Sequence, residues 1–203
     1  MNVTIFDHGA GNLHSLAKAL ERAGAIVCIE SDPIAALDTP ALVLPGVGAF
    51  GAAAERLAPG RDAMRDALAG GMPCLGVCLG MQLLFDGSDE GAGRGLGLIP
   101  GRVRELHTQR RPHMGWNDVE PAAGAAGASA PALLAYFAHS FVCEPADPSC
   151  VVATTTHEHE RFVSAVRLYR TLGVQFHPEK SGSAGLALLA AWLEAVRAPE
   201  VRS

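Results

Sequence analysis

The stretch "GMPCLGVCLGMQLLF", residues 71 to 85, joins an apolar run that ends at Val77 to a run that favours a helix from Leu79. A short apolar run next to turn residues is typical of a buried strand. The stretch therefore predicts a strand, a sharp turn and a helix. Cys78 occupies the turn, with Gly76 and Gly80 two positions to either side.

Two interpretations of Cys78 fit this stretch. Cysteine is a small hydrophobe that is often buried, so packing in a core explains it. The other interpretation is a nucleophile elbow, the strand-to-helix turn that raises a reactive side chain above a sheet. The two glycines would allow the close backbone approach that an elbow needs, and a helix start favours the thiolate form. The stretch alone leaves both open, whereas Cys74, inside the strand, is predicted to be core.

Outward from this stretch, the first half of the chain alternates short apolar runs with amphipathic ones. Continuous apolar strands separated by helices predict a parallel sheet that is covered on both faces. The predicted strands are residues 2–6, 25–29, 41–45 and 72–77, and the predicted helices are residues 13–23 and 52–69.

In the second half of the chain the alternation of strands and helices ends, because strand-like runs follow one another with little helix between them. This order predicts a partly antiparallel section. The runs are residues 101–106, 115–120, 135–143, 150–156, 161–169 and 171–176, before a closing helix at 183–196. The low-complexity stretch at 121–132 is predicted to be a surface loop. The predicted fold is an open α/β sheet, mostly parallel, with helices on both faces and an antiparallel section in the second half.

Composition bounds the function classes. The 203 residues are 49% hydrophobic and 18% charged, which is typical of a globular chain, and we expect one domain over residues 1–203. A net charge of -5 argues against a nucleic-acid binder. No segment has the pattern of a transmembrane helix or a signal peptide. Five cysteines without a repeating spacing argue against a disulfide framework, so we expect a reduced, cytoplasmic protein.

A second candidate site is "GVQFHPEKS", residues 173 to 181. His177 and Glu179 lie two apart in a run predicted to be extended, which puts both side chains on one side of the backbone. A carboxylate beside an imidazole can orient it and stabilise its charged form, as in a nucleophile–base–orienter triad. An ordinary loop with a surface histidine and glutamate explains the same residues.

A third candidate is the glycine loop "LPGVGAFG", residues 44 to 51, which follows a predicted strand. Two glycines around Val47 make backbone N–H groups available to an oxyanion, although such turns commonly only connect elements. The loop lacks the G-K-[ST] of a phosphate-binding Walker motif. Two weaker candidates remain: His157 and His159 as metal ligands or solvated hairpin residues, and "RRPHMGWN", residues 110 to 117, as a contact surface or a packed turn.

Taken together, these motifs resemble the class I glutamine amidotransferases. G-x-C-x-G-x-Q, followed about a hundred residues later by H-P-E, is similar to the pattern of that class. Within it, "PGVGAFG", "GVCLGMQLLF", "GLGLIPG", "PHMGWN" and "GVQFHPEKSG" resemble the glutaminase subunits of imidazole glycerol phosphate synthases. Related amidotransferases carry a P-G-P-G or G-G-P variant of the glycine loop, so Val47 discriminates among them. The resemblance covers nearly the whole chain.

The resemblance implies a Cys-His-Glu triad that cleaves the side-chain amide of L-glutamine through a glutamyl thioester. Cys78 would be the nucleophile, His177 the base and Glu179 its orienter. No cofactor or metal is implied. The implied oxyanion hole is Gly46, Val47, Gly48 and Leu79, and the implied glutamine-binding residues are Gln82, Glu90, His139, Ser140 and Phe141.

The resemblance also implies a partner, a (β/α)₈-barrel cyclase in a heterodimer, to which ammonia passes. That cyclase makes imidazole glycerol phosphate and aminoimidazole carboxamide ribotide in histidine biosynthesis. We expect Asn12, Met114, Trp116 and Lys180 to contact it. The resting subunit of the family is nearly silent until nucleotide binding on the partner turns a peptide of the glycine loop. This chain departs from the family at His8, where a tyrosine is usual, and at "HEHER", residues 157 to 161.

Two alternative functions remain from the sequence. The first is an enzyme of another kind, either a stand-alone cysteine hydrolase or the glutaminase subunit of another synthase. The second is a docking subunit without catalysis, against which the joint presence of Cys78, His177 and Glu179 argues.

Overall fold

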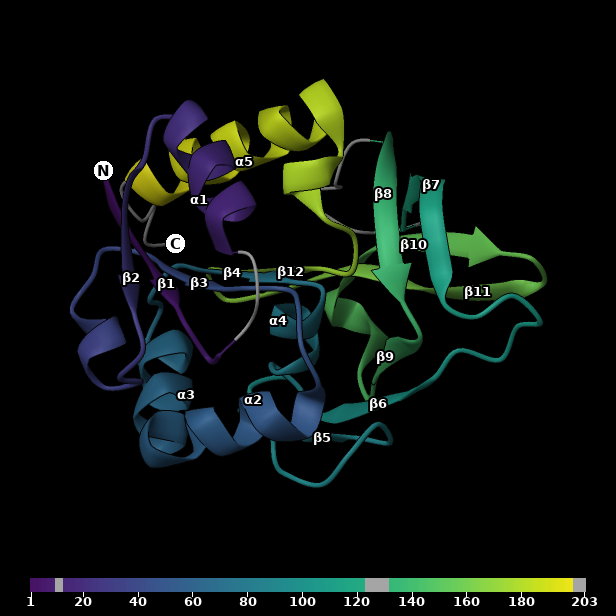
Figure 1. Cartoon of the computed structure of the whole chain (residues 1–203), viewed down its shortest axis with the longest axis horizontal. Helices are drawn as coiled ribbons and strands as arrows, with labels where there is room; N and C mark the ends of the chain where they lie inside the picture. Colours follow the sequence, from purple (N-terminus) through teal and green to yellow (C-terminus); the bar gives the residue numbers. More distant parts are fainter. Residues whose placement is uncertain (10–12, 123–131, 199–203) are drawn as a thin grey trace.

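The structure is a computed structural model, and it describes residues 1–9, 13–122 and 132–198. One continuous sheet runs through the molecule, with a parallel half and an antiparallel half (Figure 1). This arrangement confirms the predicted fold class. Asn12, which was predicted to contact a partner, lies outside the described residues, as do residues 123–131 of the surface loop predicted at 121–132. Pro121, the first residue of that predicted loop, is instead the last residue of strand β7 (His113–Pro121).

The parallel half has the strand order β2-β1-β3-β4-β12, and each neighbouring pair is parallel. Four of these strands follow one another along the chain, whereas β12 comes from near its end. Their bounds are β1 Asn2–Phe6, β2 Ile26–Glu30, β3 Leu42–Leu44, β4 Cys74–Val77 and β12 Thr171–Val174. The central strands β3, β4 and β12 are buried throughout, as continuous apolar runs predict.

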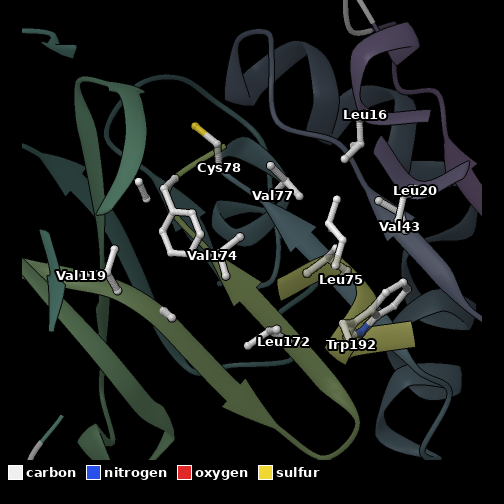
Figure 2. Packing of buried hydrophobic residues seen from close by; sticks show 14 of the residues in the cluster. Leu16, Leu20, Val43, Leu75, Val77, Cys78, Val119, Leu172, Val174 and Trp192 are labelled. Atoms are coloured by element: carbon white, nitrogen blue, oxygen red, sulfur yellow. The ribbon is translucent and has the colours of Figure 1, made fainter. Parts of the chain in front are cut away.

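Helices cover both faces of the inner parallel strands, whereas the edge strand β2 is largely exposed. Helices α1 (Leu13–Arg22) and α5 (Gly182–Arg197) lie on one face, and α2 (Phe50–Leu57), α3 (Arg61–Ala69) and α4 (Leu79–Gln82) lie on the other (Figure 1). Each face therefore has its own hydrophobic core. Figure 2 shows the first core, where Leu16 and Leu20 of α1 and Trp192 of α5 pack over Val43 and Leu75.

The antiparallel half continues the sheet from β12 in the order β11-β10-β7-β8, and β6 and β9 form a flap that joins at β11. This half confirms the antiparallel section that the sequence predicts, although the run predicted at residues 135–143 is divided at Ser140 into two strands, β8 and β9. The bounds are β5 Gly87–Ser88, β6 Gly101–Glu105, β7 His113–Pro121, β8 Leu133–His139, β9 Phe141–Pro145, β10 Val151–His157 and β11 Glu160–Leu168. Short 3₁₀ turns lie at η1 Ala35–Leu37, η2 Ala58–Gly60, η3 Pro148–Cys150 and η4 Pro178–Lys180.

The predicted helix over residues 52–69 is wrong as a single element. It starts earlier, at Phe50, and is divided into α2 and α3 by the 3₁₀ turn η2. Pro59 lies in that turn, and a proline has no backbone N–H and clashes with the preceding turn of a helix. The apolar periodicity continues across the break because both helices cover the same face of the sheet.

The turn after β4 brings the backbone of α4 directly against the neighbouring strand. A Cβ added at Gly80 would lie 2.0 Å from the carbonyl oxygen of Leu44 on β3, and one added at Gly76 would lie 2.7 Å from the carbonyl oxygen of Gly80. No side chain larger than hydrogen fits at either position. The two glycines of the opening motif therefore serve this close packing, which holds Cys78 at the carboxyl end of β4.

We expect the substitution Gly80→Ala to lower the free energy of unfolding by about 1–3 kcal/mol, the usual cost of overpacking a well-packed interior. Chemical denaturation of the purified chain measures this change. Gly87→Ala is the matched control, because a Cβ there would meet its nearest atom at an ordinary 3.6 Å. Equal stability of the two variants would contradict the close packing of α4 on β3.

Candidate active site

Cys78 has the backbone conformation of a nucleophile elbow. Its φ of 46° lies in the left-handed region, which residues other than glycine rarely adopt, and its ψ is -103°. Its backbone N–H donates to the carbonyl of Val174 on β12 at 2.7 Å, and its own carbonyl accepts from the backbone N–H of Gln82 in α4. The strained turn thus places the thiol above the carboxyl ends of the central strands, where open α/β sheets bind ligands.

His177 and Glu179 form a buried pair beside this thiol. Nδ1 of His177 lies 2.8 Å from Oε1 of Glu179, and their side chains are only 2% and 7% exposed. The backbone differs from the sequence prediction, because only His177 is extended and Glu179 lies in the 3₁₀ turn η4. Pro178 starts that turn, and its fixed φ suits the first position of a helix. The contact between His177 and Glu179 was predicted correctly, but it arises from a 3₁₀ turn and not from an extended run.

Two opposing effects set the pKa of His177. Burial lowers it, but interactions with the Cys78 thiol and with the Glu179 carboxylate together outweigh burial and raise the pKa to about 10. An imidazole with this surrounding takes up a proton readily, and Glu179 stabilises the resulting charge. The arrangement favours transfer of the thiol proton to His177.

One pocket of about 320 Å³ brings together most of the residues that the sequence singled out. It is lined by Gly46, Val47, Gly48, Cys78, Leu79, Gln82, Glu90, Pro112, Met114, Ala138, His139, Ser140, Phe141, His177 and Lys180. Glu179 does not line the pocket, because it lies behind His177. Trp116 is absent from the lining too, and its side chain is exposed on β7.

The glycine loop after β3 lies against the elbow. A Cβ added at Gly46 would lie 2.7 Å from the carbonyl oxygen of Val77 and 3.0 Å from Cβ of Cys78. Gly48 has a φ of 124°, which suits glycine. Across the elbow, the N–H of Leu79 belongs to the first turn of α4, where helical N–H groups have no partner within the helix. Both predicted sources of oxyanion donors therefore border the same pocket.

His8, which replaces the usual tyrosine, lies beneath this loop. Its ring is buried, and Nε2 donates to the carbonyl of Pro45 at 3.2 Å. Burial lowers the pKa of His8, and the hydrogen bond to Pro45 opposes that effect. The first turn of the chain thus contacts the glycine loop through a side chain that does not line the pocket.

Glu90 and Lys180 place opposite charges at the pocket, from different elements. Oε2 of Glu90 accepts from the N–H of Phe50 at 3.0 Å, which ties the segment after β5 to the start of α2. Lys180 is exposed, and its Nζ lies 5.8 Å from the ring centroid of Tyr136. A zwitterionic amino acid suits a pocket with both charges.

His139 belongs to a chain of hydrogen bonds in which each member has a defined role. Its Nδ1 donates to the carbonyl of Phe141 at 3.0 Å, so its Nε2 is the acceptor for Nδ1–H of His113 at 3.0 Å. Nε2 of His113 in turn accepts from Asn117 at 3.2 Å. Both nitrogens of His139 already have partners, so its ring offers no free nitrogen to a ligand. The chain requires both histidines to be neutral.

The pKa values of these two histidines agree with a neutral chain. Burial, assisted by the nearby His157, lowers the pKa of His113 to about 4. Burial, assisted by His113, lowers the pKa of His139 to about 3. A histidine whose pKa is lowered on folding stabilises the folded state above its unfolded pKa of 6.5, and this stabilisation is lost as the pH falls.

We therefore expect the free energy of unfolding to decrease between pH 6.5 and pH 5, with about 2 kcal/mol of the decrease due to His139. Denaturation curves at pH 6.5 and pH 5 measure it, because the raised pKa of His177 changes stability mainly above pH 6.5. The variant His139→Gln, which cannot titrate, should show a correspondingly shallower decrease. An equally steep decrease in that variant would show that other groups cause the acid lability.

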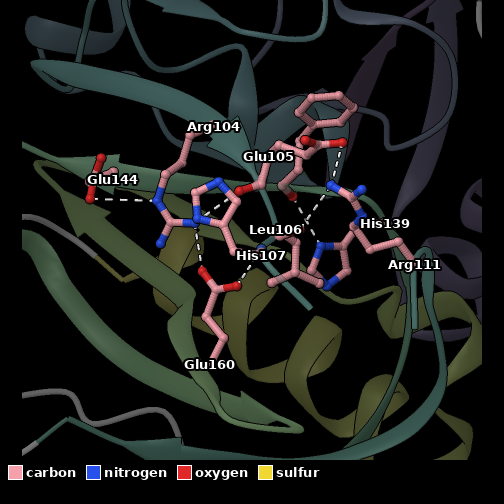
Figure 3. A network of polar contacts seen from close by, with 9 residues as sticks. Arg104, Glu105, Leu106, His107, Arg111, His139, Glu144 and Glu160 are labelled. Atoms are coloured by element: carbon pink, nitrogen blue, oxygen red, sulfur yellow. Dashed lines mark hydrogen bonds and ion pairs between the residues drawn. The ribbon is translucent and has the colours of Figure 1, made fainter. Parts of the chain in front are cut away.

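A network of ion pairs supports the connection that leads into β7 (Figure 3). Arg104 on β6 pairs with Glu160 at 2.6 Å and with Glu144 at 3.6 Å, and Glu160 also accepts from the N–H of His107. Arg111 pairs with Glu105 and donates to the carbonyl of Leu106. These contacts hold residues 106–112 in place, and that segment brings Pro112 to the pocket and leads into β7.

The remaining candidates do not form a metal site in the described part of the chain, where no three His, Cys, Asp or Glu side chains are grouped for a metal ion. His157 stacks on His113 and bonds to the carbonyl of Arg110 at 3.1 Å. The β10–β11 hairpin turns at Glu158, which has a positive φ. No described helix is long and apolar enough to span a membrane.

Sequence reasoning missed Gln175, which is fully buried and touches the thiol. Its Nε2 donates to Sγ of Cys78 at 3.4 Å. A signal was present, because Gln175 lies two residues before His177 at the end of a predicted strand, and residues two apart share one side. A polar side chain at that position in an apolar strand indicates a buried partner.

Comparisons with known proteins show the family of the chain. The family described as "Glutamine amidotransferase class-I" matches residues 4–194. The "Imidazole glycerol phosphate synthase subunit HisH" of Halobacterium salinarum is 46% identical, over 93% of this chain and 90% of its own length. Its namesake from Cutibacterium acnes is 45% identical, over 95% and 96%. Among solved structures, "Crystal structure of glutamine amidotransferase" superposes with a TM-score of 0.76 at 19% identity, covering 97% of this chain and 99% of that one.

Proposed function

The chain belongs to the class I glutamine amidotransferases, and we propose that it hydrolyses the side-chain amide of glutamine for an imidazole glycerol phosphate synthase. One observation carries the proposal. The strained elbow places the Cys78 thiol in a single pocket with His177 and the glycine loop, and Glu179 lies directly behind His177. A nucleophile, a base, an orienter and oxyanion donors are the groups that acyl transfer requires.

In the first half of the reaction, His177 takes the thiol proton and Sγ of Cys78 attacks the amide carbon of glutamine. The C–N bond then breaks, His177 returns its proton to the leaving nitrogen, and ammonia and a glutamyl thioester result. In the second half, a water molecule loses a proton to His177 and attacks the thioester, which releases glutamate and restores the thiol. Glu179 holds the imidazole in orientation throughout.

The negative charge that develops on the amide oxygen needs donors from both sides of the elbow. The N–H of Leu79 is one, and the loop of Gly46, Val47 and Gly48 supplies the other. Glu90 would pair with the substrate ammonium group, while Ser140 and the nearby backbone would hold the rest of the glutamine. Gln82 would contact the substrate through the part of its amide that its internal hydrogen bonds leave available.

A partner subunit belongs to this function, because the relatives are named as one subunit of a synthase. We propose that the partner is a (β/α)₈-barrel cyclase that receives the ammonia. An apolar surface on β7 supports docking beside the pocket, since Met114, which lines the pocket, is 65% exposed and Trp116, two residues further along the strand, is 54% exposed. Lys180, at the rim of the same pocket, would sense the partner. Exposed large apolar groups next to a site commonly mark an interface.

The proposal is tested by measuring glutamine hydrolysis by the isolated chain, by its complex with the cyclase, and by the complex with the cyclase nucleotide. We expect the nucleotide-bound complex to hydrolyse glutamine roughly a hundredfold to a thousandfold faster than the isolated chain. This is the change in rate that the loss or gain of one oxyanion donor causes. The donor concerned is the glycine-loop peptide near Val47, which the glycines leave free to turn.

Each other outcome identifies a different function. An isolated chain as fast as the nucleotide-bound complex would make the protein a stand-alone hydrolase. Absence of hydrolysis in every condition, with complex formation intact, would make it a docking subunit. Activation by a different synthase partner would assign it to another pathway.

A further inference from the structure

The buried amide of Gln175 lies against the nucleophile because of the sheet register. Val174 pairs with Val77 across the parallel strands β12 and β4, so Gln175 and Cys78 are the next positions on adjacent strands. The N–H of Cys78 donates to the carbonyl of Val174, which continues this register to the elbow. Gln175 has no exposed surface, and its Nε2 lies 3.4 Å from Sγ.

The orientation of this amide follows from a backbone carbonyl on another strand. Nε2 of Gln82 donates to the carbonyl of Phe141 at 3.1 Å, and a carbonyl oxygen can only accept. The second hydrogen of that Nε2 points to Gln175, where it requires an acceptor at 3.4 Å. Gln175 must therefore turn its oxygen toward Gln82, which leaves its NH₂ group facing the sulfur.

The carbonyl of Phe141 is itself held in place. Nδ1 of His139 donates to it at 3.0 Å, and the histidine chain through His113 holds His139. The direction of every hydrogen bond from β7 to the sulfur is thus consistent, and reversing the Gln175 amide would bring two donors or two acceptors together. A buried network whose donors and acceptors are matched in this way specifies one arrangement.

We propose that Gln175 donates a hydrogen bond that stabilises the Cys78 thiolate, and that Gln82 is a positioning residue that keeps the Gln175 amide turned toward the sulfur. The inference deepens the proposed function and rests on it. An N–H donor interacts more strongly with a charged acceptor than with a neutral one, so it favours the thiolate over the thiol. His177 removes the proton, and Gln175 stabilises the charge that remains.

A merely structural role for Gln175, as a partner for the Gln82 amide, predicts no effect on the titration of the thiol. Measuring the rate at which iodoacetamide alkylates Cys78 as a function of pH distinguishes this structural role from stabilisation of the thiolate. The full-length chain is used with Cys28→Ser, because Cys28 is the exposed cysteine among the described residues. This measurement needs neither glutamine nor a partner, so its failure is distinguishable from failure of the proposed function.

Gln175→Met removes the donor and preserves the length of the side chain. We expect the midpoint of the alkylation profile to rise by about one pH unit, with about tenfold slower alkylation at neutral pH. The other titratable groups near the sulfur are His177, with Glu179 behind it, and Cys143 on β9, and the variant leaves them unchanged. An unchanged midpoint in the folded variant overturns the inference.

Two further variants complete the test. Gln82→Met leaves the Gln175 side chain unchanged, but it frees the Gln175 amide to turn, so the midpoint of this variant should rise as well. Thr171→Val is the matched control on the same strand, because the Thr171 hydroxyl is buried without a partner among the described residues. Its midpoint should stay at the wild-type value. If Gln175→Met fails to fold, the result for Gln82→Met decides, and an unchanged midpoint there overturns the inference.

Discussion

Cys78→Ala should abolish glutamine-dependent synthesis by the complex and leave ammonia-dependent synthesis intact. The sulfur of Cys78 forms the covalent bond between the enzyme and the amide carbon of glutamine, so its removal eliminates the thioester route. The expected loss of glutamine hydrolysis is roughly a millionfold, as when a protease loses its nucleophile. Free ammonia bypasses this step and reacts at the cyclase. Both activities are measured on the same purified complex, with glutamine or with an ammonium salt.

Cys74→Ala is the matched control for this experiment. Cys74 is a fully buried cysteine on the same strand, and burial raises the pKa of its thiol well above the usual value. It should affect stability and leave glutamine hydrolysis nearly unchanged. A comparable loss in both variants would assign the effect to packing of β4. A Cys78→Ala complex that assembles and yet fails with ammonium salts would contradict the division of roles between the subunits.

His177→Ala should cause a loss close to that of Cys78→Ala, whereas Glu179→Gln should cause a loss about a hundredfold smaller. Removing the base leaves no group to take the thiol proton, while removing the orienter leaves both nucleophile and base in place. In a serine protease the corresponding losses differ by roughly this ratio. The glutamine keeps the length of Glu179 and can still contact Nδ1, so the expected defect lies in charge stabilisation.

Single-turnover rates of thioester formation by the activated complex measure this difference, because they separate chemistry from product release. Gln109→Glu, in the segment before β7, is a suitable control, since it alters one exposed amide away from the pocket lining. Equal losses from His177→Ala and Glu179→Gln would show that Glu179 does more than orient the imidazole. A negligible loss from His177→Ala would contradict the triad itself.

Much of the fold was predictable because the relevant signals are local. Buried parallel strands require continuous apolar runs, and the runs predicted at residues 2–6, 41–45 and 72–77 each contain a strand. The single helix predicted over residues 52–69 was wrong because the apolar periodicity of the sequence continues across a short 3₁₀ turn. Pro59 was the local signal for the break between the two helices, and the spacing of apolar residues by itself did not show that break.

The candidate site was predictable in its members and less so in its geometry. Cys78, His177 and Glu179 were identified by their motifs, and the structure brings them together as expected. Glu179 reaches His177 from a 3₁₀ turn, which depends on how Pro178 leads into α5. His139 was expected to hold the glutamine, yet its ring nitrogens serve the hydrogen-bond chain with His113.

The sequence by itself determined most of the strands, which side chains can react, and that a thiol lies between a strand and a helix; it did not predict β5 or the division of residues 135–143 into β8 and β9. These properties depend on neighbouring residues, through apolar periodicity, glycine sterics and side-chain chemistry. Only the tertiary structure decided what surrounds the thiol. Gln175 lies 97 residues from Cys78, and the two meet because β12 pairs with β4 in one register. The direction of the Gln175 amide depends on the carbonyl of Phe141, since buried donors and acceptors must be matched across the whole network.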